Sequence, residues 1–557
     1  MRILSTIPTR VILPALIALT SMSLAPASEQ EDPHAGCAAP PSYVPAELLE
    51  RTVALRSGIG NSRETVTTSS AEAQAFYNQG LNYLESYVWI EASRSFHQAL
   101  RLDADLAMAF IGLSRTQSGL DNPEAAKLMW EKAEALTPKV SPREKRLIDI
   151  REKQLAAMES IEDAAKFLAY KKALDDALGA DVENPQLWLL RGMAEESNAS
   201  GRGQRGTASS IAFYRQVLKL VPDHASAHHY LVHTYETIGS IEKALEHGEV
   251  YAHLAPAIPH AAHMWAHDLR RVGRVDEAIA QFLKAAQLER DYYGAEKIEP
   301  ALDWHHGHNL DLLASCYEHK GQMKQAEATM REAAALGAVD AYRAFNFREL
   351  PNFLIHRGRY DEALEAARRM TTMEYPQAST VGHALAGQAL IGLDRIKEAG
   401  ESLDAAQRTL ELIPVTTSGL TPRRSVVQPW VDALRGEVLM KTGKAEEGTA
   451  LLKDVQRALR ATPGPDAWSQ ALFRLEAMAR TAREMGAWDL AEHTAKQMIE
   501  HDAAYGGSHL AMALVLQHKG DAAAAAREME AARSAWAQAD PDLPELRVIT
   551  ATLAGKR

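Results

Sequence analysis

From Ala73 onward the sequence repeats with a period of about 34 residues, and this period constrains the fold more than any other feature. The first unit alternates aromatic and small residues at Phe76, Gly80, Tyr83, Ala92, Phe96 and Ala99. Each half of the unit has apolar residues three or four positions apart, which predicts two helices per unit. One helix pair leaves an apolar face uncovered, so consecutive units must stack to bury it.

A turn signal recurs between the two helices of a unit. It reads Gly-Arg-Val-Asp-Glu-Ala at 273–278, Gly-Arg-Tyr-Asp-Glu-Ala at 358–363 and Gly-Lys-Ala-Glu-Glu-Gly at 443–448. Glycine is preferred just after a helix, and acids are preferred in the first turn of the next one. Together with the aromatic and small-residue pattern, these turns resemble the tetratricopeptide repeat (TPR) family. The resemblance implies an all-α fold, a right-handed α-solenoid of antiparallel helix pairs (a TPR superhelix), arranged as one array or as two sub-arrays.

The composition divides the chain into several predicted segments. An N-terminal charged region, an apolar run and the triplet Ala25-Pro26-Ala27 predict a signal peptide at 1–27. An extended N-terminal arm is expected at 28–70, where Pro, Ser and Thr are frequent and periodicity is lacking. A TPR array follows at 71–413, with its His-rich units at about 223–335. The rest comprises a linker at 414–428, a C-terminal TPR-like array at 429–540 and a tail at 541–557.

These segments predict an exported protein, periplasmic or secreted, without an integral membrane span in the mature chain; anchoring through the N-terminus is the alternative. The net charge of −12 and the lack of a basic stripe argue against nucleic-acid binding. Only Cys37 and Cys316 are available for a disulfide, and the sequence does not decide whether they pair.

Histidines are crowded in the fourth, fifth and sixth units. His229 and His233, like His263 and His267, are four residues apart, so each pair lies on one face of a helix. Positions 2, 5, 9 and 12 of the first helix share a face, and in the TPR family they line the concave groove. Candidate metal ligands on this face are His229, His233, His260, His263, His267, His308 and Asp311. A mixed shell of imidazole and carboxylate is suited to Zn, Cu, Fe or Mn.

The segment His305-His306-Gly-His308-Asn309 and the two His-rich helices before it resemble a group of bacterial exported TPR proteins with a central histidine cluster. We therefore expect a scaffold that binds a protein or peptide partner in its concave groove, with a transition-metal site formed by three consecutive repeats. There are two simpler interpretations. In one, the groove is polar and holds no metal; in the other, the histidines serve only in packing. A metal-dependent hydrolase or oxidase, with Glu236 or Glu318 as base, and a metal carrier are the alternatives. No established catalytic motif supports an enzyme, so the scaffold is favoured.

Overall fold

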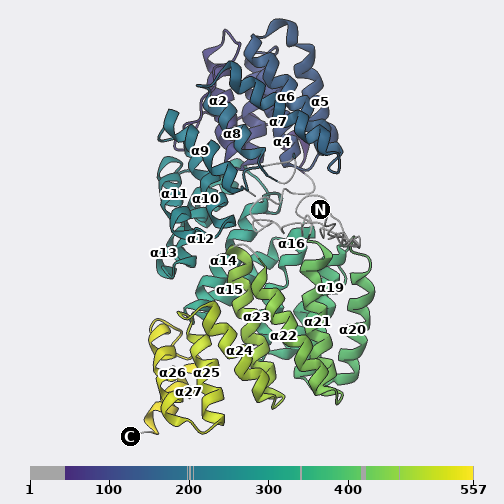
Figure 1. Cartoon of the computed structure of the whole chain (residues 1–557), viewed down its shortest axis with the longest axis vertical. Helices are drawn as coiled ribbons and strands as arrows, with labels where there is room; N and C mark the ends of the chain where they lie inside the picture. The colour runs from purple at the N-terminus through teal and green to yellow at the C-terminus, as the bar shows by residue number, and fades with distance from the viewer. Residues whose placement is uncertain are drawn as a thin grey trace, which may run out of the picture. The chain divides into compact units, whose positions relative to one another are not determined.

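The computed structural model describes residues 44–196, 199, 202–204, 206–338, 341–414, 422–462 and 465–555. Within these residues all regular structure is helical and no strand occurs, so the all-α prediction is confirmed (Figure 1). None of the described helices combines the length and the apolar character needed to cross a bilayer. The predicted signal peptide and Cys37 lie outside the described residues, and Cys316 is a buried free thiol.

The helices follow one another in antiparallel pairs. The first nine are α1 (Ala46–Leu49), α2 (Ala71–Glu85), α3 (Trp89–Leu102), α4 (Ala107–Gly119), α5 (Pro123–Ala135), α6 (Pro142–Glu159), α7 (Ala164–Ala180), α8 (Pro185–Met193) and α9 (Ala208–Leu220). The next nine are α10 (Ala225–Thr237), α11 (Ile241–Leu254), α12 (Pro259–Arg271), α13 (Val275–Glu296), α14 (Trp304–His319), α15 (Met323–Ala335), α16 (Ala341–Asn346), α17 (Glu349–His356) and α18 (Tyr360–Thr371). The last nine are α19 (Pro376–Gly392), α20 (Ile396–Leu410), α21 (Arg424–Lys441), α22 (Ala445–Ala461), α23 (Pro465–Glu484), α24 (Trp488–His501), α25 (Gly506–His518), α26 (Ala522–Ala535) and α27 (Pro544–Ala554). Neighbouring pairs pack on one another, as a solenoid requires.

Two features of the repeat pattern account for the pairing. The ring of Phe96 fills the crossing between α2, α3 and α4, where a Cβ on Gly112 would come within 2.4 Å of it. The predicted turns also form, since Gly273 and Gly358 adopt φ values of +80° and +68°. Only glycine takes this left-handed conformation readily, which ends one helix and directs the chain into the next.

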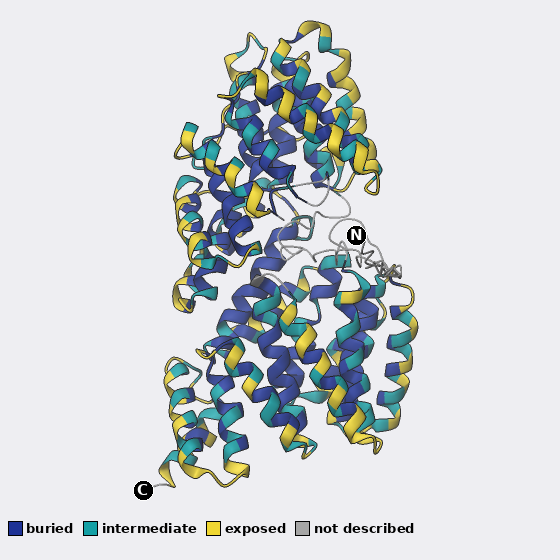
Figure 2. Cartoon of the chain, in the orientation of Figure 1, coloured by how far each residue is buried: buried dark blue, intermediate teal, exposed yellow. Residues whose placement is uncertain are grey.

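The first helix of each middle unit lies inside and the second lies outside. Almost every residue of α10, α12 and α14 is buried, whereas α11 and α13 bury only one face (Figure 2). The irregular stretch at 51–70 contributes to this burial. Its Asn61 accepts from the amide of Ala225 at 3.0 Å and donates to the carbonyl of Asp223 at 2.7 Å, so it docks at the start of α10.

The C-terminal repeats also contact the middle ones. Helix α23 packs against α12, α14 and α17, although it follows them by more than a hundred residues. The indole of Trp536 donates to the carbonyl of His319 at 3.2 Å, and the amide of Asp540 donates to that of Gly321 at 3.1 Å. Ile413 and Val427, which lie on either side of residues 415–421, belong to one apolar cluster; residues 415–421 of the predicted linker are outside the described residues.

Candidate metal centre

The structure brings together all six histidines that the sequence predicts as ligands. They project from α10, α12 and α14, and each residue is at most 2% exposed. They fall into two groups: an N-triad of His229, His233 and His260, and a C-triad of His263, His267 and His308. In each triad one nitrogen per ring lies within 4.8 Å of the other two, which is close enough for one metal ion to bind all three.

The nitrogens of the N-triad lie close to one another. The Nε2 atom of His229 lies 3.0 Å from Nε2 of His233 and 3.1 Å from Nε2 of His260. Nitrogen ligands held 2.0–2.1 Å from a tetrahedral zinc ion lie about 3.3 Å apart. The three ring nitrogens therefore converge with nearly the spacing that one ion would require.

The hydrogen bond at the other side of His229 determines which nitrogen faces the triad. Its Nδ1 donates to the carbonyl of Glu85 at 2.8 Å, so the neutral form of the ring would carry its lone pair on Nε2. That single lone pair faces the Nε2 atoms of both His233 and His260. One lone pair accepts only one well-aligned hydrogen bond, whereas an ion at the centre would satisfy all three rings. Histidines that bind metals commonly donate their second nitrogen to a carbonyl in this way.

Tyr87 forms one wall of the N-triad. Its ring centroid lies 4.7 Å from that of His229, 5.8 Å from that of His233 and 5.3 Å from that of His260. Its φ is +60°, which is unfavourable for a bulky side chain. Its hydroxyl donates to the carbonyl of Arg202 at 2.5 Å, and its ring is buried. Packing and this hydrogen bond thus hold a strained backbone beside the three histidines.

We expect Tyr87→Gly to be more stable than Tyr87→Ala by about 1 kcal/mol, because glycine relieves the left-handed backbone. Both variants should still lose about 3 kcal/mol or more relative to the parent, because the aromatic packing is lost. Urea unfolding of the two variants measures the difference. The matched control is Tyr83, a buried residue of helix α2, where glycine should instead be less stable than alanine by about 0.5–1 kcal/mol. The same order at both positions would contradict strain at Tyr87.

The C-triad has its own supporting hydrogen bonds. Nδ1 of His263 donates to Oδ1 of Asn309 at 2.9 Å, and Nδ2 of Asn309 donates to the carbonyl of Phe282 at 3.0 Å. The second bond fixes the orientation of the amide, so the first fixes the proton of His263 on Nδ1. Its Nε2 then carries the lone pair, points into the triad and has no hydrogen-bond partner among the described residues.

A carboxylate from a distant repeat reaches the C-triad. Asp466, in the first turn of α23, places Oδ1 3.6 Å from Nε2 of His267 and Oδ2 3.6 Å from Nε2 of His308. Burial raises the pKa of Asp466 to about 6, although the neighbouring His267 lowers it. The sequence did not point to this residue, because it falls among the weak C-terminal repeats and has no histidine close to it in the chain.

The electrostatics keep several of the imidazoles neutral. Burial, and next the neighbouring histidines, hold the pKa values of His260 and His263 well below 6.5, and burial lowers that of His267 to about 4. Near neutral pH these rings are therefore uncharged, which is the form that binds metal ions.

Acidic side chains lie behind the triads. Glu236 lies 3.8 Å from Nδ1 of His233 and 3.5 Å from Nδ1 of His267, so it touches both groups on the side away from the converging nitrogens. The carboxylate of Glu289 accepts hydrogen bonds from Nδ1 of both His305 and His306. Burial would raise the pKa of Glu289, but these two histidines lower it to about 2.

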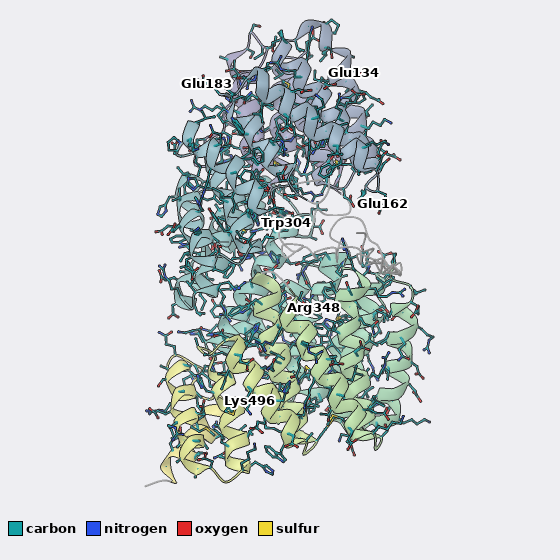
Figure 3. All side chains as sticks on the ribbon, in the orientation of Figure 1. Glu134, Glu162, Glu183, Trp304, Arg348 and Lys496 are labelled. Carbon is teal, nitrogen blue, oxygen red and sulfur yellow. The ribbon has the colours of Figure 1, made fainter. Side chains whose placement is uncertain are left out.

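His305 stands between the two triads. Its ring centroid lies 5.1 Å from that of His260 and 4.5 Å from that of His263. A cavity of ≈ 80 Å³ adjoins it, lined among others by Tyr87, His260 and Trp304. Trp304, labelled in Figure 3, begins α14 and lies 5.9 Å from His260 between ring centroids.

Two acids predicted from the sequence lie elsewhere. Asp311, a predicted ligand, has its Oδ2 2.6 Å from Nη1 of Arg343 and is in neither triad. Glu318, a predicted alternative base, has its Oε1 2.8 Å from Nδ1 of His356. The positions expected to line an open groove in the His-rich units are buried, so the structure leaves no free concave surface at these six histidines.

The comparisons with known proteins do not identify the chain. No family model matches it, and no curated protein matches its sequence. Among solved structures, the MamA protein is 15% identical, with a TM-score of 0.21 and coverage of 41% of this chain and 96% of that chain. The human IFIT1 dimer with PPP-AAAA is also 15% identical, with a TM-score of 0.34 and coverage of 83% and 90%. Similarities this distant establish neither family nor function.

Proposed function

We propose that this protein is an exported helical-repeat scaffold that binds transition-metal ions in a buried histidine centre. The observation that carries the proposal is the convergence of three Nε2 atoms in the N-triad around the lone pair of His229. Three imidazoles suit Zn²⁺ and copper better than Mg²⁺ or Ca²⁺, which prefer oxygen ligands.

The burial of the centre favours a resident ion over a transient one. Its ligands come from three helices whose inner faces are almost fully buried, so an ion can leave only if the packing opens. Slow exchange is therefore expected, which argues against a carrier that must release its metal readily.

Binding of a protein or peptide partner and export through residues 1–27 remain part of the proposal. The partner is expected on repeats other than α10, α12 and α14, because the inner faces of these helices are occupied by the protein itself. The resemblance to the TPR family supports partner binding, and the N-terminal charged and apolar regions support export.

Metal analysis tests the proposal. Full-length protein purified without an affinity tag should contain Zn or Cu, and His229→Ala combined with His260→Ala should lose about one ion per chain, because only one N-triad ligand remains. The matched control combines His253→Ala and His383→Ala, two histidines outside both triads. Mass spectrometry of the metal content and circular dichroism measure loss of the ion and retention of the fold. Unchanged metal content in the triad variant, or no metal uptake by the parent, would contradict the proposal.

A further inference from the structure

We infer that Asp466 completes a second, four-ligand metal site with the C-triad, and that an ion of the Zn²⁺ type there fastens α23 to α12 and α14. The inference depends on the proposed metal binding by the histidine centre, but it concerns a different ion and a different ligand set. The N-triad contributes none of its ligands.

The distances around Asp466 are those of a ligand shell. Each of its carboxylate oxygens lies 3.6 Å from a different imidazole nitrogen, one on His267 and one on His308. These separations are too long for hydrogen bonds. They lie near the roughly 3.3 Å that separates nitrogen and oxygen ligands of one tetrahedral zinc ion.

Three of the four ligand side chains carry unsatisfied atoms. Nε2 of His263, Nε2 of His267 and Oδ1 of Asp466 are buried, and none has a hydrogen-bond partner in the part of the chain that the structure describes. A buried polar atom without a partner destabilises the folded state, so three of them together need a compensating group. A dication bound by all of them would satisfy the nitrogens and neutralise the carboxylate.

The surrounding bonds orient this shell. Asn309 holds the proton of His263 on Nδ1, away from the site. Glu236 lies 3.5 Å from Nδ1 of His267, which favours a proton on that nitrogen and leaves Nε2 free to bind metal. Carboxylate and amide partners of this kind support histidine ligands in metal sites.

The two sites differ in what they offer an ion. The C-triad with Asp466 supplies three nitrogens and one oxygen, which is a complete tetrahedral set and typical of a structural site. The N-triad supplies three nitrogens, with the ring of Tyr87 beside them. Because Asp466 belongs to α23, only the second ion would connect the C-terminal repeats to the middle ones.

Other contacts hold the C-terminal repeats against α12 and α14 without metal. Nη1 of Arg270 lies 3.3 Å from Oδ2 of Asp502, His319 lies 3.2 Å from the same oxygen, and the guanidinium of Arg270 lies 4.8 Å from the ring centroid of Trp468. Removal of the Asp466 carboxylate should therefore weaken the site without unfolding α23.

The test is a zinc titration of the full-length apoprotein by calorimetry. The parent should bind two ions, and Asp466→Asn should bind the second at least roughly 100-fold more weakly, since it loses a charged ligand while keeping its shape. Asp489→Asn is the matched control, because Asp489 is an exposed acid in the first turn of α24, as Asp466 is in the first turn of α23. The control separates ligand loss from a change at a helix N-terminus.

The outcomes distinguish the two proposals. A parent that binds one ion, lost only on substitution of His229 and His260, would overturn the second site and leave the proposed function standing. Two sites of unchanged affinity in Asp466→Asn would likewise overturn the role of Asp466. No zinc binding at all would overturn both. Loss of one ion in Asp466→Asn and of the other in the N-triad variant would support both sites.

Discussion

Substitution of His356 by glutamine is expected to lower the free energy of unfolding at pH 7 by about 3–5 kcal/mol. The ring of His356 lies between two buried carboxylates, with Nδ1 2.8 Å from Oε1 of Glu318 and Nε2 3.1 Å from Oε1 of Glu476. Glutamine has similar size but no charge, so it would leave both carboxylates without their shared cation. Removal of one member of a buried ion pair is costly because the remaining charge stays desolvated.

The same residue predicts a pH dependence. Burial lowers the pKa of His356, but Glu476 and Glu318 outweigh it and raise the value to about 9. The unfolded chain has a histidine pKa of about 6.5, so the bound proton stabilises the native state fully below that pH and ceases to do so as the pH rises through 9. The stability advantage of the parent over His356→Gln should therefore shrink between pH 6.5 and 9.5, by an amount on the order of 3 kcal/mol.

Urea unfolding of both proteins at several pH values from 6 to 10 measures this difference. His253→Gln serves as the control, because His253 is exposed and lies outside this cluster. Its stability should follow that of the parent at every pH. A difference between parent and His356→Gln that stays constant across the range would show that His356 is not protonated in the native state.

The helical register identified the histidines but not their grouping. Residues 260 and 263 lie on one face of α12, three positions apart, so helical periodicity alone predicts the same environment for both. In the structure His260 joins α10 and His263 joins α14. That division depends on how neighbouring helices pack side by side, which periodicity within one helix does not determine.

The acids show where sequence reasoning fails. Asp311 shares the face of His308 by register, yet Arg343 of α16 binds its carboxylate. Asp466 has no histidine near it in sequence and reaches the C-triad only because α23 packs on α12 and α14. Contacts between repeats far apart in the chain leave no local pattern, so the fold was predictable and this ligand was not.

Removal of the metal is expected to lower the hydrogen-exchange protection of the helices that carry the proposed ligands. The protection of the other repeats should stay nearly unchanged. An ion present at a thousandfold excess over its dissociation constant stabilises the folded state by about 4 kcal/mol per site. In a repeat protein each unit contacts mainly its neighbours, so this energy acts locally. Lost protection should therefore concentrate in α10, α12, α14 and α23, which carry the proposed ligands.

Hydrogen exchange of the protein with and without a chelator measures that distribution. Helices α5 to α7 and α20 to α22 carry no proposed ligand and should exchange alike in both states. The metal-free fold should persist, because His260, His263 and His267 are neutral near pH 7 and place no uncompensated positive charge in the core. In Asp466→Asn, zinc should still protect α10 and α12 but no longer α23. Equal protection of α23 in parent and variant would mean that its packing on α12 and α14, rather than an ion, holds the C-terminal repeats in place.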